Sequence, residues 1–214
     1  ANLINFDLNK NIVDACRKTN HNFIFISTDH LFSGKKKIYN EMSKESPLNY
    51  YAKTKLLIEN YIRKKNKNFL IIRTNFLAKN YSKKNKGKKS FSDYLISELK
   101  SKNKINLWED VYFNPIYVEV LFDILFKLIK SKKIGTFNVC SNNGTSKYSL
   151  GLKLAKILNL QFKNIIKSKL HTMSTVKRPK SMILDNKKIR KVLGMRKEMF
   201  DNNKQLRLLV KNYI

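Results

Sequence analysis

Short apolar runs alternate with amphipathic stretches along this chain. The segments 23–27 and Phe69–Thr74 are continuous apolar runs, which are typical of parallel strands covered on both faces. The segment 135–140 alternates apolar and polar residues, and Ile105–Trp108 is a short apolar run. Each of these two segments therefore predicts a further strand.

Apolar residues at helical spacing fill most of the segments between these strands. Ser46 followed by Pro47 is typical of an N-cap and a first-turn proline, which predicts a helix from there to about Lys65. The other predicted helices are 3–19, Phe91–Lys100, Val118–Lys130, 146–159 and a terminal helix from about Asn203. The regular exchange of strand and helix indicates an α/β fold with a parallel sheet.

The balance of charge is strongly basic. The 214 residues include 45 Lys and Arg against 15 Asp and Glu, a formal net charge of +30. Such an excess fits a binder of nucleic acid or anionic membranes, and it also fits a chain whose solvated faces carry lysine by default. The basic residues are mostly scattered lysines without an arginine-rich helix, so we favour the second interpretation and keep nucleic-acid binding as an alternative.

Neither a membrane span nor a metal site is predicted. The longest apolar run, 117–129, is interrupted by three charged residues and is too short to cross a bilayer. Cys16 and Cys140 are far apart and lie in apolar segments, without the spacing of a metal site. They are expected to be reduced, buried thiols, which points to a cytoplasmic setting.

Three side chains suggest a chemistry. Thr28 follows the first apolar strand, and ligands of open parallel sheets bind at that end of a strand. Tyr51 and Lys55 are four residues apart, so they lie on one face of the predicted helix. The ammonium of Lys55 is expected to lower the pKa of the Tyr51 phenol toward the working pH. Together they would form a site that donates a proton to a substrate carbonyl.

The same spacing occurs once more, at Tyr61 and Lys65. Lysine is so frequent here that the spacing alone has little weight, and the context distinguishes the two pairs. Tyr51 follows Thr28 by 23 residues, whereas Tyr61 lies deeper in the same helix. We therefore assign the function to Tyr51 and Lys55.

Four ordered motifs resemble the extended short-chain dehydrogenase/reductase family, and most closely its dTDP-4-dehydrorhamnose reductase branch. They are Ser27-Thr28-Asp29, Tyr51-x-x-x-Lys55, Arg73-Thr74-Asn75 and Arg178-Pro179-Lys180-Ser181, where the family pattern is Arg-Pro-x-x-Ser. The chain departs from the family pattern at His30 and Leu31, which replace Tyr-Val, and at Ala52, which replaces Gly.

The resemblance implies NAD(P)H-dependent reduction of a nucleotide-activated 4-keto-6-deoxy sugar, with NADPH and NADH both open. It implies catalytic roles for Thr28, Tyr51 and Lys55. It implies that Ser27, Tyr51, Lys55, Thr74 and Asn75 bind the cofactor, and that Thr28, His30, Asn75, Phe76 and Arg178 bind the substrate. Arg178 would hold the substrate diphosphate, and Asp29 would accept hydrogen bonds from loop backbone amides.

The glycine-rich turn that holds the cofactor pyrophosphate in this family has no counterpart, because the six glycines never cluster. The resemblance therefore implies a partial Rossmann-like parallel sheet with a small C-terminal α/β substrate-binding lobe. Residues 1–110 would be the carboxyl-terminal portion of the NAD(P)-binding domain, and 111–214 mainly the substrate-binding lobe, with elements of the two interleaved. We expect a fragment of a longer enzyme, inactive when isolated and with one sheet edge exposed.

Alternatives to a reductase remain open. An epimerase or dehydratase of the same family would use the same Tyr-Lys pair, although dehydratases usually carry Glu where this chain has His30. A non-catalytic regulatory subunit of the same fold is a second alternative, and a nucleic-acid binder with its charge on one face is a third. The sequence also leaves open a homodimer and the identity of the sugar and nucleotide.

Overall fold

The computed structural model of this protein describes residues 6–80, 89–170 and 176–213. The α-helices are α1 (Leu8–Lys18), α2 (Tyr50–Lys65), α3 (Phe91–Lys100), α4 (Val118–Lys130), α5 (Lys147–Ile157), α6 (Lys187–Leu193) and α7 (Asn202–Val210). The 3-10 helices are η2 (Asp29–Leu31) and η4 (Lys197–Phe200). The strands are β1 (Phe23–Thr28), β2 (Phe69–Thr74), β3 (Phe76–Leu77), β4 (Ile105–Trp108), β5 (Tyr112–Phe113), β6 (Ile116–Tyr117), β7 (Gly135–Asn138), β8 (Thr145–Ser146) and β9 (Ile165–Ser168).

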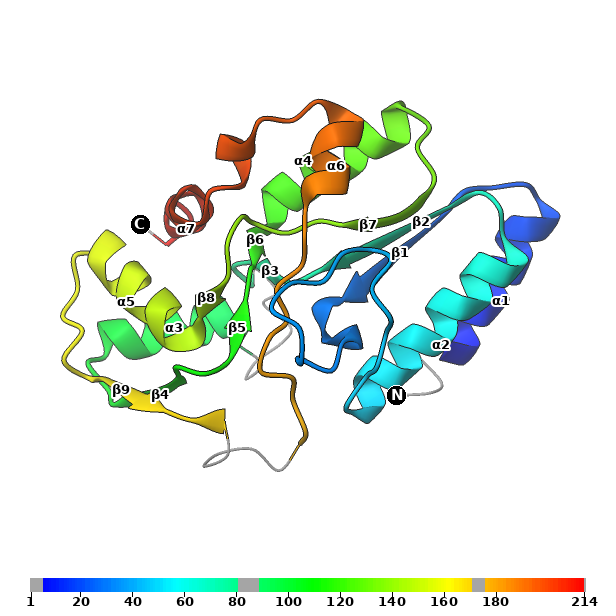
Figure 1. The fold of residues 1–214 in the computed structure, drawn as a ribbon. Coiled ribbons are helices and arrows are strands. Elements are labelled where there is room, and N and C mark those ends of the chain that lie inside the picture. The colour runs from blue at the N-terminus through cyan, green and yellow to red at the C-terminus, as the bar shows by residue number, and fades with distance from the viewer. Residues whose placement is uncertain (1–5, 81–88, 171–175, 214) are drawn as a thin grey trace.

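A parallel sheet in the order β1-β2-β7 forms the centre of one half of the molecule (Figure 1). The register pairs Thr28 with Thr74, so β1 and β2 end side by side. The predicted α/β fold with a Rossmann-like parallel sheet is confirmed. β1 is an edge strand of this sheet, and no strand of the described residues pairs with its outer edge.

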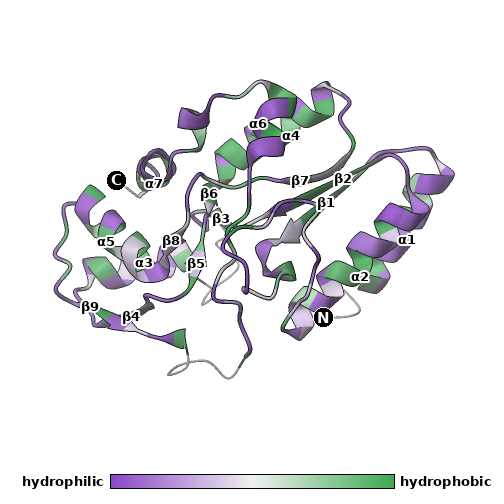
Figure 2. Cartoon of the chain, in the orientation of Figure 1, coloured by the Kyte–Doolittle hydropathy of each residue, from purple (hydrophilic) through white to green (hydrophobic). Residues whose placement is uncertain are grey.

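Helices cover both faces of this sheet. On one face α1 and α2 lie side by side (Figure 1), and Val13, Ile58 and Ile62 pack against Phe25 and Ile71 of the strands. α4 and α6 pack on the other face, where the buried cluster is Leu70, Ile72, Ile116, Leu121, Ile124, Leu128, Phe137, Val139, Ile189, Met195 and Phe200. The helices are banded in hydrophilic and hydrophobic colours in Figure 2, as expected of helices that bury one side.

A second hydrophobic core lies between α3, α5, α7 and three short strand pairs. The pairs are β3 with β6 and β4 with β9, both parallel, and β5 with β8, which is antiparallel. Leu95, Leu107, Leu154 and Leu209 are among its buried side chains. Segments on both sides of residue 110 contribute to this core.

A buried ion pair fixes the end of β2. Arg73 is fully buried, and its Nη2 donates to Oε2 of Glu59 at 2.7 Å and to Oε1 of Glu45. Glu59 is also fully buried and comes from α2, so the pair joins the helix to the strand. Because an unpaired charge in this position would be costly, the pair holds both elements in one geometry.

Some boundaries differ from the sequence-based predictions. α2 begins at Tyr50 rather than at Pro47, because Asn49 is the N-cap and accepts a hydrogen bond from the Ala52 amide at 3.0 Å. Ser46 is held in the preceding loop, where its amide donates to the Leu31 carbonyl at 2.8 Å. β7 ends at Asn138 instead of residue 140, and the first part of the predicted helix 3–19 lies outside the described residues.

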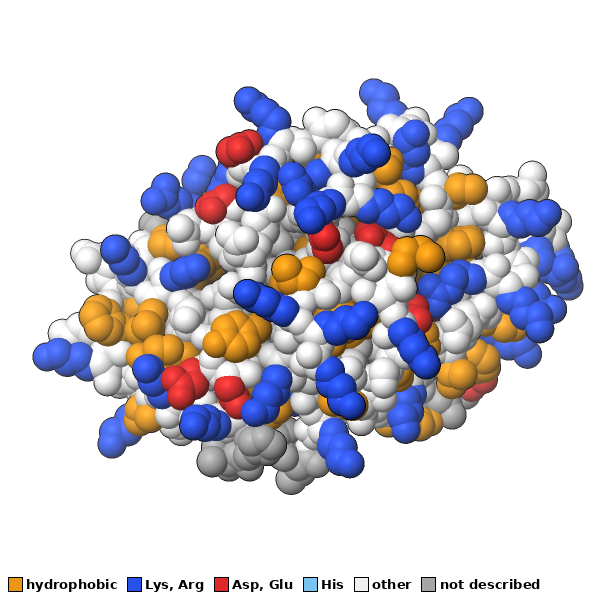
Figure 3. All heavy atoms as spheres, in the orientation of Figure 1, with side chains coloured by type: hydrophobic (Ala, Val, Ile, Leu, Met, Phe, Trp, Pro, Cys, Tyr) orange, Lys and Arg blue, Asp and Glu red, His pale blue; other side chains and the backbone are white. Residues whose placement is uncertain are grey.

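Two surface properties bear on the alternative functions. In the described part of the chain, no helix has the length and apolar composition that crossing a membrane requires. Figure 3 shows Lys and Arg side chains spread over the whole visible face, with hydrophobic and uncharged atoms between them. A nucleic-acid binder would be expected to gather these charges in one stripe.

Candidate active site

A cavity of about 450 Å³ opens at the carboxyl end of β1. Thr28 from the strand end and Tyr51 and Lys55 from α2 all line it. Of the other site residues predicted from the sequence, those that also line it are Ser27, His30, Thr74, Asn75 and Phe76. Arg178 does not line this cavity.

Thr28 has a structural role as well as a place in the cavity. Its Oγ1 accepts a hydrogen bond from the His30 amide at 3.2 Å and so caps η2. The same hydroxyl is 3.3 Å from Oδ1 of Asp29. These bonds fix the hydroxyl where the strand ends, and it also forms a hydrogen bond with Tyr51.

The effect of Lys55 on Tyr51 differs from the prediction. Burial and the charge of Asp29 raise the pKa of Tyr51 above its ordinary value, and only the hydrogen bond with Thr28 lowers it. Nζ of Lys55 instead donates to the Ile26 carbonyl at 3.1 Å and lies 4.5 Å from the centre of the Phe25 ring. The phenol is therefore fully protonated at neutral pH, the form that donates a proton.

Asp29 is a buried carboxyl group directly behind Thr28. Its partners are the side chains of Thr28 and Asn75, whose Nδ2 donates to Oδ2 at 3.0 Å, and the Asp29 backbone amide, whereas the sequence suggested loop backbone amides alone. Burial raises the pKa of Asp29 to about 7, although these hydrogen bonds and the charge of Lys147 oppose the rise. Burial and the charges of Arg178 and Lys147 lower the pKa of His30 to about 4, so the imidazole is neutral at pH 7.

A smaller cavity of about 130 Å³ adjoins the first, and His30 and Asn75 line both. Arg178 lies here, with its guanidinium 5.7 Å from the centre of the Trp108 ring. Nε of Arg178 and Nδ1 of His30 are buried without a hydrogen-bond partner. Two unsatisfied polar atoms in one small cavity indicate a place where a ligand supplies the missing partners.

Lys147, the first residue of α5, was not predicted from the sequence. Its Nζ lies 4.5 Å from the centre of the Trp108 ring and 4.9 Å from that of Phe91 in the smaller cavity. Burial and the nearby charge of Arg178 lower the pKa of Lys147 to about 8. Nothing in the sequence distinguishes it from the many other lysines.

The larger cavity has groups that suit the nicotinamide end of a dinucleotide. The hydroxyls of Ser27 and Thr74 are buried there without a hydrogen-bond partner. No glycine-rich turn exists in the sequence for the pyrophosphate. Among the described residues, no three His, Cys, Asp or Glu side chains lie close enough together to hold a metal ion.

Comparison with known proteins adds a family and relatives. The model of a family described as the RmlD substrate binding domain matches residues 1–213. Methionine adenosyltransferase 2 subunit beta from Pongo abelii is 24% identical over 197 residues, which are 88% of this chain and 58% of the relative. A probable low-salt glycan biosynthesis reductase from Haloferax volcanii is 26% identical over 139 residues, 64% of this chain and 45% of the relative. The chain thus spans less than two thirds of the length of these relatives.

Solved structures share the fold. A dTDP-4-dehydrorhamnose reductase from Bacillus anthracis in complex with NADP superposes with a TM-score of 0.85 at 22% identity, over 95% of this chain and 70% of that one. A hypothetical dTDP-4-dehydrorhamnose reductase from Sulfolobus tokodaii gives a TM-score of 0.78 at 28% identity, over 90% and 66% of the two chains.

Proposed function

This chain belongs to the RmlD substrate binding domain family of sugar-nucleotide reductases related to the short-chain dehydrogenases, and from that premise we propose that it serves the NAD(P)H-dependent reduction of a nucleotide-activated 4-keto-6-deoxy sugar. The observation that carries the proposal is the convergence of Thr28, Tyr51 and Lys55 on one cavity at a strand end. These residues come from two elements, and their meeting gives a hydroxyl, a phenol and an ammonium around one space.

In the proposed reaction Tyr51 donates its proton to the carbonyl oxygen of the sugar. Thr28 orients that oxygen by a hydrogen bond, since its hydroxyl is already fixed beside Tyr51. The phenolate that remains on Tyr51 carries a negative charge, which the ammonium of Lys55 stabilises once it leaves the Ile26 carbonyl. General acid catalysis of this kind contributes roughly 10²–10⁴-fold to a rate.

A nicotinamide cofactor supplies the hydride when it is bound. Ser27 and Thr74 offer unpaired hydroxyls for it, and Tyr51, Lys55 and Asn75 line the same cavity. Solved relatives are described in complex with NADP and with NAD⁺, so both cofactors are to be assayed.

The substrate would lie across both cavities. Its diphosphate would accept hydrogen bonds from Arg178, whose Nε lacks a partner, and Lys147 adds a second positive charge beside it. His30, Asn75 and Phe76 would surround the sugar between the diphosphate and Tyr51.

A non-catalytic subunit is the second candidate, because several curated relatives are named as subunit beta of methionine adenosyltransferase 2. In that case the fold would serve association with another protein. The clustering of Thr28, Tyr51 and Lys55 favours the reductase, since association alone does not need these three side chains in one cavity.

Turnover by the complete gene product tests the two candidates. With NADPH or NADH and dTDP-4-dehydrorhamnose, we expect keto-sugar-dependent cofactor oxidation, and Tyr51→Phe should lower kcat by at least about 100-fold. A Tyr51→Phe variant with unchanged kcat would refute the assigned acid. No turnover by the unaltered protein with either cofactor would favour the non-catalytic subunit.

A further inference from the structure

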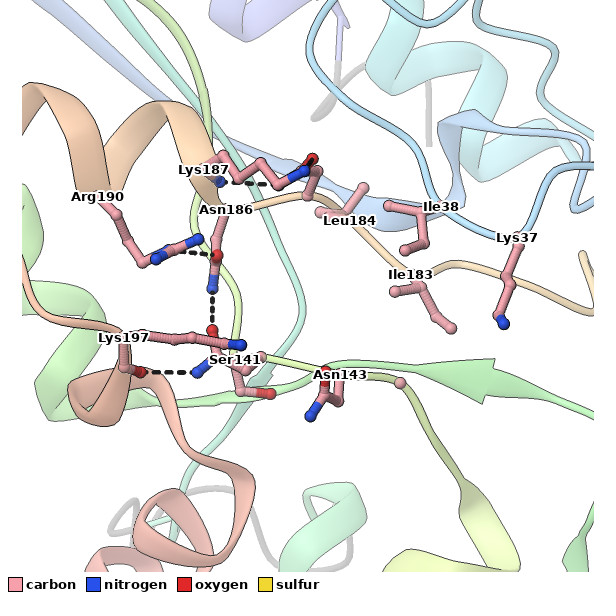
Figure 4. A pocket seen from close by; sticks show the side chains of 13 residues that line it. Lys37, Ile38, Ser141, Asn143, Ile183, Leu184, Asn186, Lys187, Arg190 and Lys197 are labelled. Atoms are coloured by element: carbon pink, nitrogen blue, oxygen red, sulfur yellow. Dashed lines mark hydrogen bonds and ion pairs between the residues drawn. The ribbon is translucent and has the colours of Figure 1, made fainter.

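A third cavity, of about 430 Å³, lies away from the two described above and shares no lining residue with them. It forms where the loop 141–144 after β7 meets the segment 183–187 that leads into α6 (Figure 4). Because this loop leaves the carboxyl end of β7, the cavity lies at the edge where open parallel sheets commonly bind ligands. Its volume is within the roughly 300–1,000 Å³ of small-molecule sites.

The charges around this cavity are unbalanced. Lys37, Lys187, Arg190 and Lys197 line it together with a single carboxylate, Asp185. Asp185 is already matched, since Nζ of Lys187 lies 3.7 Å from its Oδ2. Among the described residues, no carboxylate lies within 4 Å of the charged nitrogens of the other three cations. Three uncompensated positive charges around one cavity favour a multiply charged anion.

One hydrogen-bond network holds the guanidinium of Arg190 and the backbone of Lys197. Nε of Arg190 donates to Oδ1 of Asn186 at 3.0 Å, and Nδ2 of Asn186 donates to Oδ1 of Asn142 at 3.0 Å. Nδ2 of Asn142 then donates to the backbone carbonyl of Lys197 at 2.7 Å. The network leaves the terminal nitrogens of the Arg190 guanidinium for a ligand, and such a fork suits phosphate oxygens.

The opposite wall is apolar. Figure 4 shows Arg190 and Lys197 on one side of the cavity and Ile38, Ile183 and Lys37 on the other. A Cβ on Gly144 would lie 2.1 Å from Cδ1 of Ile183, so glycine is what allows the isoleucine to lie against the loop. A ligand that fits both walls has a phosphate group at one end and a flat, weakly polar group at the other.

We propose that this cavity binds a nucleoside diphosphate, with the phosphates on Arg190 and Lys197 and the base on Ile38 and Ile183. The site is separate from the proposed active site and does not depend on the reductase activity. Lys37, on the same side as the two isoleucines, is a third positive charge of the cavity and adds to the electrostatic attraction for the negatively charged diphosphate.

Calorimetric titration of the protein with ADP at an ionic strength of about 0.15 M, where the Debye length is about 8 Å, tests the proposal. We expect saturable binding that weakens about tenfold in Lys37→Ala/Lys197→Ala, which removes one partner of the phosphates and one further positive charge of the cavity. Arg190→Gln removes the other phosphate partner and should weaken binding by a similar factor. Adenosine alone should bind far more weakly than ADP. Lys37 and Lys197 are exposed, so their double variant should fold normally, which circular dichroism can verify.

The matched control is Lys104→Ala/Lys163→Ala, which removes the same charge from exposed positions that line none of these cavities. ADP affinity in this control should stay within about twofold of the unaltered protein, since exposed charges at a distance are screened. Arg178→Ala should also leave it within about twofold, because Arg178 lines the smaller cavity of the proposed active site and not this one. Equal weakening in the control would show that ADP responds only to net charge and would overturn the proposal. An absence of saturable binding, or a loss confined to Arg178→Ala, would overturn it as well.

Discussion

Nδ2 of Asn75 donates a hydrogen bond to Oδ2 of Asp29 at 3.0 Å, and this bond joins the segments that follow two neighbouring strands. The strands β1 and β2 end in register at Thr28 and Thr74. Asp29 and Asn75 are the residues that directly follow these two strand ends. Asp29 is therefore held directly behind the Thr28 hydroxyl, in a place where only 1% of its surface is exposed. The position and protonation of this carboxyl are consequences of the sheet register.

Asp29 should make stability depend on pH in the direction opposite to most carboxyls. Its pKa is about 7 in the folded protein against 3.8 ordinarily, so between those values the folded chain keeps a proton that the unfolded chain has lost. The free energy of unfolding should fall as pH rises through this window, by about 4 kcal/mol in all. Urea unfolding at pH 5 and pH 8 should show a smaller decrease in Asp29→Asn than in the unaltered protein, and equal decreases would contradict the assignment.

The Arg73–Glu59 pair should be essential for stability. Glu59→Gln leaves Arg73 charged and fully buried with only Glu45 as a counter-charge, and the loss should be about 3–5 kcal/mol. Glu109→Gln removes an exposed pair with Lys167 at 3.6 Å and should cost less than about 1 kcal/mol. Urea denaturation of both variants gives the comparison, and similar losses in the two would show that burial of the pair has no energetic weight.

Tyr61 is the internal control for Tyr51, because both lie on α2 with a lysine four residues later. Its hydroxyl donates to Asp14 of α1 at 2.7 Å, and it lines none of the cavities described above. Tyr61→Phe should lower the melting temperature slightly and leave kcat unchanged. Tyr51→Phe should lower kcat and leave the melting temperature unchanged. Loss of turnover in Tyr61→Phe would show that the wrong tyrosine has been assigned.

The native Lys147 side chain should lower the free energy of unfolding and strengthen the binding of the substrate. Its charge is buried at the start of α5, where a positive charge is unfavourable, so Lys147→Met should raise the free energy of unfolding by about 1–3 kcal/mol. In the assay of the proposed reductase activity the same variant should raise KM for the nucleotide sugar about tenfold or more, with little change in kcat.

The pH profile provides a second readout for Lys147. Because its pKa is about 8, KM of the unaltered enzyme should rise as the pH passes 8, and this rise should be absent in Lys147→Met. Lys153→Met, on the same helix, is the control and should alter neither KM nor its pH dependence. An unchanged KM in Lys147→Met would remove this lysine from the substrate site.

Strong local patterns predicted their elements well. Phe91–Lys100 and Val118–Lys130 are helices with the predicted bounds, and Phe69–Thr74 is the predicted strand, because each has a clear apolar pattern bounded by polar residues. β9 (Ile165–Ser168) was not predicted, since its four residues form a strand only by pairing with β4. The start of α2 was misplaced because two capping signals, Ser46 and Asn49, compete and tertiary contacts decide between them.

The candidate site was only partly visible in the sequence. The sequence singled out Thr28, Tyr51 and Lys55 because a strand end and a helix face can be predicted from local patterns, and the three side chains line one cavity. Lys147 and Arg190 are ordinary members of a set of 45 cations, and only long-range packing places them in cavities. The raised pKa of Asp29 likewise follows from burial, which spacing does not reveal.

His30 and Asn75 form a shared partition between the two cavities of the proposed active site. A molecule that takes hydrogen bonds from this partition on one side alters what remains for a molecule on the other. The two occupants are therefore thermodynamically linked: whatever factor the first imposes on the affinity of the second, the second imposes on the first. The cofactor in the larger cavity and the substrate that reaches into both would then each alter the affinity of the other through these two side chains.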